Sequence, residues 1–190
     1  MISKKQFSQF MSHHPSLLDP ENLIHWQKHL VGHQHSLFAK KALIKSRYLA
    51  SEDSYSLGNL YNYATSLDIL SISPQNLNFW FWPNECCNGA AIYFVIDHPP
   101  HLESPILLYI GETSQAEKRW KGNHACKDYL AAYCEAVHRG KLQENLSIRF
   151  WSDVPTDALK RRTIEEILID FWRPGLNKLI YQRWQNPFLY

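Results

Sequence analysis

The chain lacks any uninterrupted apolar run of about 18 residues, the length that a membrane-spanning helix requires. Its start, residues 1–7, also lacks the apolar centre of a secretory signal, so we expect none there. No C-x-x-C pair is present, and two of the four cysteines are adjacent and therefore poorly placed to bridge each other. The cysteines are Cys86, Cys87, Cys126 and Cys134. These absences predict free thiols in a reducing cytoplasm and a protein with no membrane partner.

A strong net charge is missing as well. The 20 Lys and Arg and the 18 Asp and Glu leave a formal net charge of +2, so the whole molecule is not a strong attractor of nucleic acid. Any nucleic-acid surface must come from local clusters of basic residues. Hydrophobic residues make up 45% of the 190 residues, which is ordinary for a folded domain. This length allows one domain with a core, with or without an extension.

Residues 1–80 show helical spacing of their apolar side chains, as in Leu23, Trp26 and Leu30. Further helical stretches are predicted near residues 36–50 and 57–70. We therefore expect a mainly helical N-terminal extension over residues 1–80, a candidate region for binding substrate or a partner.

Three histidines in this region, His25, His29 and His33, recur at i, i+4 and i+8. On one helical face they could bind zinc, although no cysteine or carboxylate completes a site and Gly32 weakens the helix there. An exposed histidine face is the open alternative.

The pattern changes to strands after residue 89, because β-branched and aromatic residues dominate. Strands are predicted at residues 90–96, 105–110 and 146–151. The first two are close enough in sequence to form an antiparallel pair, and Gly111 is interpreted as the end of the second. Helices are predicted to begin at Ser114, where a capping box fits, and to cover residues 126–137.

The last long helix has the clearest boundaries. Pro155 and Thr156 are predicted to start it, with Asp157 in its first turn, and Arg173-Pro174-Gly175 ends it. Its apolar stripe consists of Ile164, Ile167, Leu168, Phe171 and Trp172. At about 100° per residue, Glu165 lies on the rim of this stripe, whereas Glu166 faces water.

A set of spaced polar residues suits phosphodiester hydrolysis. A tyrosine can orient the attacking water, an arginine can pair with phosphate oxygens, and one carboxylate can suffice for Mg²⁺. The chain offers Tyr93, Tyr109, Arg119 and Glu165, with Asn177 twelve residues beyond the glutamate. Structural alternatives stay open: packing tyrosines on strands, a helix-surface arginine, a solvated glutamate and an asparagine in a turn.

The same positions form ordered motifs. Ala91-Ile92-Tyr93 is similar to a G-I-Y triplet, and Tyr109-Ile110-Gly111 is a complete Y-I-G. Arg119 follows, and residues 165–169 with residues 173–177 are similar to E-x-x-L-I and P-x-L-N. Over about residues 89–177 the chain thus resembles the GIY-YIG nuclease superfamily. The resemblance implies an α+β fold with a small three-stranded antiparallel sheet flanked by helices, in a nuclease domain spanning residues 81–190.

The resemblance also implies roles for individual residues. Tyr93 would be the general base or its partner, Arg119 would hold the scissile phosphate, and Glu165 would bind Mg²⁺ or Mn²⁺. Tyr109 would hydrogen-bond in the same site, and Asn177 would support it through structure. The implied catalytic set is Tyr93, Tyr109, Arg119, His124, Glu165 and Asn177. Some restriction enzymes of the family have a histidine four residues after the arginine. Here His124 follows Arg119 by five residues, so the alternative that it is an ordinary surface histidine stays open.

Two positions depart from the family pattern. Ala91 replaces the first glycine, and Glu112 stands where many members have lysine, which adds negative charge near the expected phosphate path. Basic clusters could form the substrate track or simply be solvated faces. They are Lys40, Lys41, Lys45, Arg47, Lys118, Lys121, Lys160, Arg161 and Arg162.

The predicted function is a divalent-metal-dependent endonuclease, with DNA favoured over RNA. The alternative is a catalytically inactive module on the same scaffold that binds nucleic acid or protein.

Overall fold

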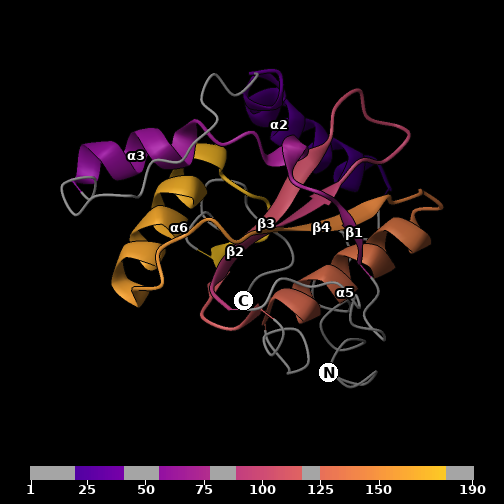
Figure 1. The fold of residues 1–190 in the computed structure, drawn as a ribbon. Coiled ribbons are helices and arrows are strands. Elements are labelled where there is room, and N and C mark those ends of the chain that lie inside the picture. Colours follow the sequence, from indigo (N-terminus) through magenta and orange to yellow (C-terminus); the bar gives the residue numbers. More distant parts are fainter. Residues whose placement is uncertain (1–19, 41–55, 78–88, 117–124, 179–190) are drawn as a thin grey trace.

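In the computed structural model, the described parts of the chain are residues 20–40, 56–77, 89–116 and 125–178. The elements in chain order are α2 (Pro20–Phe38), α3 (Leu57–Thr65), the 3-10 helix η3 (Ile69–Ser71), β1 (Gln75–Asn76), β2 (Ala91–Asp97), β3 (Ile106–Thr113), α5 (Ala125–Arg139), β4 (Leu146–Trp151) and α6 (Ala158–Trp172). Together they form an α+β fold in which one antiparallel sheet lies between helices, with α3 and α6 on one side (Figure 1).

The sheet has four strands in the order β1-β4-β2-β3. Its three long strands are those predicted from the sequence, but the expected three-stranded sheet was wrong in strand number. The additional strand, β1, pairs Gln75 with Ile148 and Asn76 with Ser147. A strand of two residues has no side-chain periodicity, so the sequence carried no signal for it.

Strand β3 also runs further than expected. Gly111 does not end it: this residue pairs with Tyr93, and the strand continues to Thr113, opposite Ala91. The extra residues carry β3 past the Y-I-G triplet, so that Glu112 is a strand residue at the edge of the sheet.

Two hydrophobic clusters cover the two faces of the sheet. One contains side chains of α2 and α5, and the other contains side chains of α3 and α6. All seven residues of β2 are buried, which explains the continuous apolar sequence of residues 91–96. Helices α2 and α3 contribute core residues such as Leu30 and Leu60. The boundary at residue 80 is therefore a change in sequence pattern, while the described residues on its two sides share one core.

The helices of residues 20–77 agree in part with the sequence. α2 continues through Gly32 to Phe38, and most of the second stretch predicted over residues 36–50 lies outside the described residues. α3 begins after Ser56, whose side chain accepts a hydrogen bond from the Asn59 N–H. It ends earlier than predicted, and η3 follows.

Two sequence-based expectations concern the membrane and the cysteines. Among the described helices, none combines the length and the apolar character needed to cross a bilayer. Cys126 and Cys134 are both thiols, and burial raises the pKa of the Cys134 thiol to about 12. Cys134 therefore stays protonated and is a poor nucleophile. Cys86 and Cys87 lie outside the described residues.

Asp97, the last residue of β2, has a buried carboxyl group that connects several elements. Tyr133 of α5 donates a hydrogen bond to Asp97 Oδ2 at 2.6 Å, and the Asn145 N–H donates to Oδ1 at 2.6 Å. The Tyr133 hydroxyl in turn accepts a hydrogen bond from Gln27 of α2 at 2.7 Å. Asp97 thus joins β2, two helices and the segment before β4, and its side chain is fully buried. Burial raises the pKa of Asp97 from its ordinary 3.8, against the lowering effect of its hydrogen bonds.

This raised pKa predicts a pH dependence of stability. The folded protein binds the Asp97 proton more tightly than the unfolded chain, so the favourable contribution is complete below pH 3.8. It decreases as the pH rises through the folded-state pKa. As the pH rises from 3.8 through the folded-state pKa of Asp97, the free energy of unfolding of the non-titrating variant Asp97→Asn should therefore increase relative to that of the wild type. Urea unfolding at successive pH values measures the difference, and a constant difference contradicts the prediction.

Candidate active site

The two motif tyrosines lie together on the face of the sheet covered by α2 and α5. Tyr93 of β2 is opposite Gly111, and Val95 is opposite Tyr109, so both phenols project from the same face. Their rings are stacked, with centroids 6.0 Å apart and planes 17° from parallel. Tyr93 is fully buried and Tyr109 is half-buried. The predicted proximity of the two phenols is therefore present.

Gly111 allows the Tyr93 ring to lie directly over the β3 backbone. A Cβ atom at position 111 would come within 2.3 Å of both Cζ and Oη of Tyr93, far inside van der Waals contact. The glycine is required for this close approach and not for a turn. Because β3 is an edge strand, the ring extends from the central strand towards the border of the sheet.

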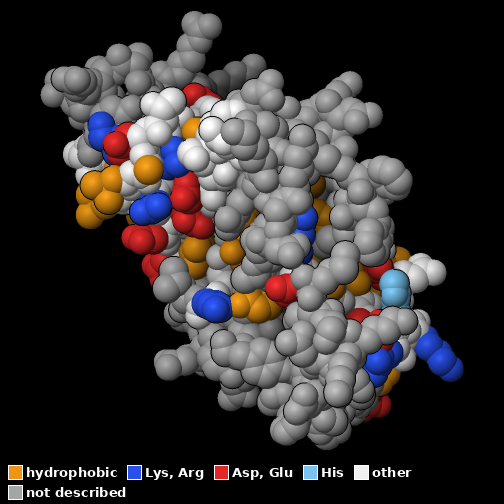
Figure 2. All heavy atoms as spheres, turned by 90° about the horizontal axis from the view of Figure 1, so that it is seen from below, with side chains coloured by type: hydrophobic (Ala, Val, Ile, Leu, Met, Phe, Trp, Pro, Cys, Tyr) orange, Lys and Arg blue, Asp and Glu red, His pale blue; other side chains and the backbone are white. Residues whose placement is uncertain are grey.

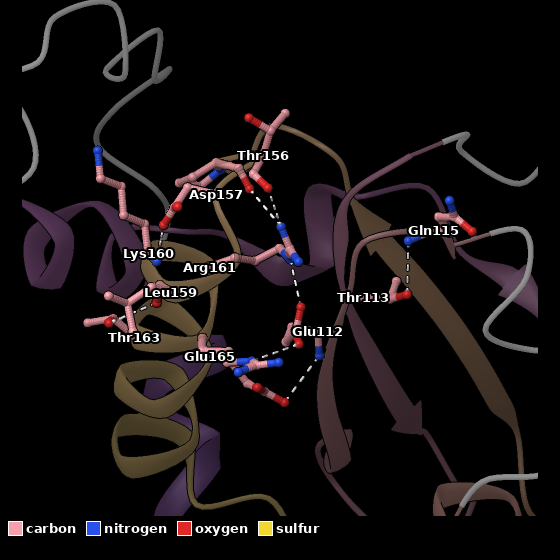
Figure 3. A network of polar contacts seen from close by, with 12 residues as sticks. Glu112, Thr113, Gln115, Thr156, Asp157, Leu159, Lys160, Arg161, Thr163 and Glu165 are labelled. Carbon is pink, nitrogen blue, oxygen red and sulfur yellow. Dashed lines mark hydrogen bonds and ion pairs between the residues drawn. The ribbon is translucent and has the colours of Figure 1, made fainter.

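Glu165 reaches the same border from the other side. It is half-buried on α6, on the rim of the buried stripe as predicted, and Glu166 is exposed. Glu165 Oε1 accepts a hydrogen bond at 3.1 Å from the backbone N–H of Glu112 (Figure 3). Glu112 directly follows Gly111, over which the Tyr93 phenol lies. The phenols and α6 thus occupy opposite faces of the sheet, and the Glu165 carboxylate binds the β3 backbone one residue from Gly111.

Asn177, which follows α6, binds the same edge strand, β3. Its Oδ1 accepts from the Ile110 N–H at 3.0 Å, and its Nδ2 donates to the Ile110 carbonyl at 2.8 Å. The neighbouring Leu176 N–H donates to the Leu108 carbonyl at 2.7 Å. The segment after α6 therefore satisfies backbone groups of β3 that an open edge would expose. The Asn177 side chain thus ties the segment after α6 to β3.

Glu112 is the centre of an ionic network between β3 and α6. Its Oε2 lies 2.7 Å from Nε of Arg161, and its Oε1 lies 3.5 Å from Nε of Arg162. Arg161 is 1% exposed, and its Nη1 donates to the carbonyls of Pro155 and Thr156 (Figure 3). The prediction that Arg161 binds substrate was wrong, because a buried guanidinium with these partners does not reach a phosphate. Helical spacing held the signal: position 161 precedes the buried Ile164 and Leu168 by three and seven residues.

The other predicted basic residues are distributed differently. Arg162 and Lys40 are exposed and Lys160 is half-buried; the Lys40 ammonium lies 5.8 Å from the centre of the Phe171 ring. Over the described atoms in the view of Figure 2, basic and acidic side chains are interspersed. Predicted site residues that lie outside the described residues are Lys41, Lys45, Arg47, Lys118, Arg119, Lys121 and His124.

The histidines of α2 do not converge as a set of three. His25 and His29 are exposed, with ring centroids 4.5 Å apart, whereas His33 Nε2 lies 3.1 Å from the Phe171 carbonyl oxygen. In the described ranges, no group of three or more His, Cys, Asp or Glu side chains could hold a metal ion. A Mg²⁺ site that uses one protein carboxylate and several waters remains compatible with the position of Glu165.

The buried ion pair predicts a large effect on stability. Glu112→Leu leaves the Arg161 charge buried without its carboxylate, so we expect the free energy of unfolding to fall by about 3–5 kcal/mol. The matched control is Glu135→Gln, which breaks an exposed i, i+4 pair with Arg139 and should cost less than about 0.5 kcal/mol. Denaturant unfolding of both variants measures this difference; equal losses contradict the importance of burial.

Comparisons of the chain with models of protein families, with curated proteins and with solved structures found no match.

Proposed function

We propose that this protein is a divalent-metal-dependent endonuclease of the GIY-YIG type, acting on DNA in preference to RNA. One observation carries the proposal: the Tyr93 phenol lies over Gly111, while the Glu165 carboxylate binds the amide of the adjacent Glu112. A group able to orient or deprotonate water and a group able to bind a hard cation thus contact adjacent residues of β3.

Each residue has a defined part in the proposed reaction. Glu165 would hold Mg²⁺ or Mn²⁺, which supplies charge neutralisation at the phosphate. Tyr93 orients the attacking water or accepts its proton; because a free phenol has a pKa near ~10, the second role requires nearby cations. Arg119, by its position in the motif, would pair with the scissile phosphate. Tyr109 stacks on Tyr93 and restricts the orientation of its ring.

A second candidate is a scaffold that binds nucleic acid or protein without hydrolysis. Two observations favour it: Tyr93 is fully buried, and Glu112 places a second carboxylate beside Glu165 where many family members have lysine. In this case the interactions of Glu165 and Asn177 with β3 would serve folding alone.

Cleavage and binding assays separate the two candidates. The purified protein is incubated with supercoiled plasmid, DNA oligonucleotides and structured RNA, in Mg²⁺, in Mn²⁺ and with a chelator, with Glu165→Ala as the control. We expect metal-dependent nicking of DNA by the wild type that the control lacks. Binding without cleavage of every substrate would support the inactive scaffold and reject the nuclease.

A further inference from the structure

We infer that Glu112 and Arg161 are positioning residues that fix the carboxylate of Glu165. The inference rests on the proposed function, because it concerns the metal ligand of that site. Glu112 is one of the two positions at which the chain departs from the family pattern, so the resemblance assigns it no role.

Residue 112 is attached to α6 at two points. Its carboxylate pairs with Arg161 at 2.7 Å, and its backbone N–H donates to Glu165 at 3.1 Å. Positions 161 and 165 are four residues apart, so they lie one above the other on the same side of the helix. The two contacts act as a clamp: β3 cannot move along α6 without losing both. The amide that orients the Glu165 carboxylate is therefore held in place by the side chain of the same residue.

On the helix side, further hydrogen bonds hold the Arg161 guanidinium in place. Its Nη1 donates to the Pro155 carbonyl at 3.1 Å and to the Thr156 carbonyl at 3.0 Å, and its side chain is 2% exposed. A planar guanidinium with three partners in fixed directions has little freedom to rotate. Figure 3 shows this group between the segment that leads into α6 and the edge of β3. Arg161 thus links three parts of the chain around Glu165.

The negative charge of Glu112 gives a competing explanation, and the direction of the change in divalent-cation affinity distinguishes the two. If Glu112 acted only as a second negative charge, removal of the Arg161 cation would strengthen the binding of a divalent cation. If the pair positions Glu165, the same change weakens binding, since partners that orient a metal ligand typically contribute about ten- to hundredfold in affinity. The two explanations therefore predict opposite results for Arg161→Met.

The test is a titration of the full-length protein with Mn²⁺ alone, followed by electron paramagnetic resonance. Glu165→Gln should abolish binding at the site. Glu112→Gln, Arg161→Met and Arg161→Lys should each weaken it about ten- to hundredfold, with the lysine variant least affected. Glu166→Gln, which removes the same charge one residue away on an exposed position, should bind as the wild type does. Thermal unfolding of each variant sets a temperature at which all are folded.

Three results would overturn the inference. Tighter Mn²⁺ binding by Arg161→Met would show that Glu112 acts through its charge alone. If that variant does not fold, wild-type Mn²⁺ affinity in both Arg161→Lys and Glu112→Gln would also reject the positioning role. Wild-type affinity in Glu112→Gln with loss in Glu165→Gln rejects the positioning role and leaves the proposed function intact. Absence of any Mn²⁺ binding that depends on Glu165 in the wild type rejects both.

Discussion

Glu165→Ala should reduce the rate of DNA cleavage by at least about a thousandfold. Loss of a metal ligand removes several kcal/mol of stabilisation of the transition state, and about 4 kcal/mol corresponds to that factor. The fold should survive, because Glu165 is half-buried and the lost hydrogen bond to the Glu112 amide contributes only about 1 kcal/mol. Single-turnover cleavage of a plasmid in Mg²⁺, with urea unfolding in parallel, measures both quantities.

The control for this variant is Glu166→Ala. It removes the same charge from the same turn of α6, but its side chain faces water. Wild-type cleavage by Glu166→Ala together with inactivity of Glu165→Ala assigns the effect to the position at the β3 edge. Equal cleavage by both variants contradicts a role for Glu165 in the reaction.

Gly111→Ala should damage stability and activity together. The added methyl group would come within 2.3 Å of Cζ and Oη of Tyr93, so the ring or the strand must move. Overpacking of this kind costs about 1–3 kcal/mol, and a displaced phenol should lower the cleavage rate by about a hundredfold. Denaturant unfolding and single-turnover cleavage of the variant measure the two losses.

Two further variants isolate the cause. Gly32→Ala places a methyl group on α2 where no atom lies within 4 Å, and it should stabilise the protein by up to about 1 kcal/mol. In a Tyr93→Ala background the ring is absent, so Gly111→Ala should cost less than in the wild type. The same cost in both backgrounds would show that the ring is not what the glycine accommodates.

Much of the fold could be predicted because its long elements carry periodic side chains. Residues 91–96 of β2 are buried on both faces and form a continuous apolar run. The apolar stripe of α6 indicated its core-facing side and the rim position of Glu165. Helix α6 begins later than predicted, at Ala158, because Asp157 is its N-cap and accepts a hydrogen bond from the Lys160 N–H. Helix α2 passes through Gly32 because the packing of residues such as Leu30 outweighs a local cost of about 1 kcal/mol.

The parts that could not be predicted depend on contacts between distant segments. β1 has two residues and exists only through its pairing with β4. The ion pair of Glu112 with Arg161 joins positions 49 residues apart, so the local sequence does not indicate the partner of the arginine. Gly111 is a strand residue that pairs with Tyr93 and leaves room for its ring. From the sequence alone, a glycine at the end of an apolar run indicates a turn.

The most direct test of the proposed site is the rate constant for Mg²⁺-dependent nicking of supercoiled plasmid by Tyr93→Phe, which removes one hydroxyl and leaves the ring over Gly111. We expect a decrease of about 10²–10⁴-fold, with a free energy of unfolding close to that of the wild type. Nicking at the wild-type rate by the folded variant would contradict a catalytic role for the phenol.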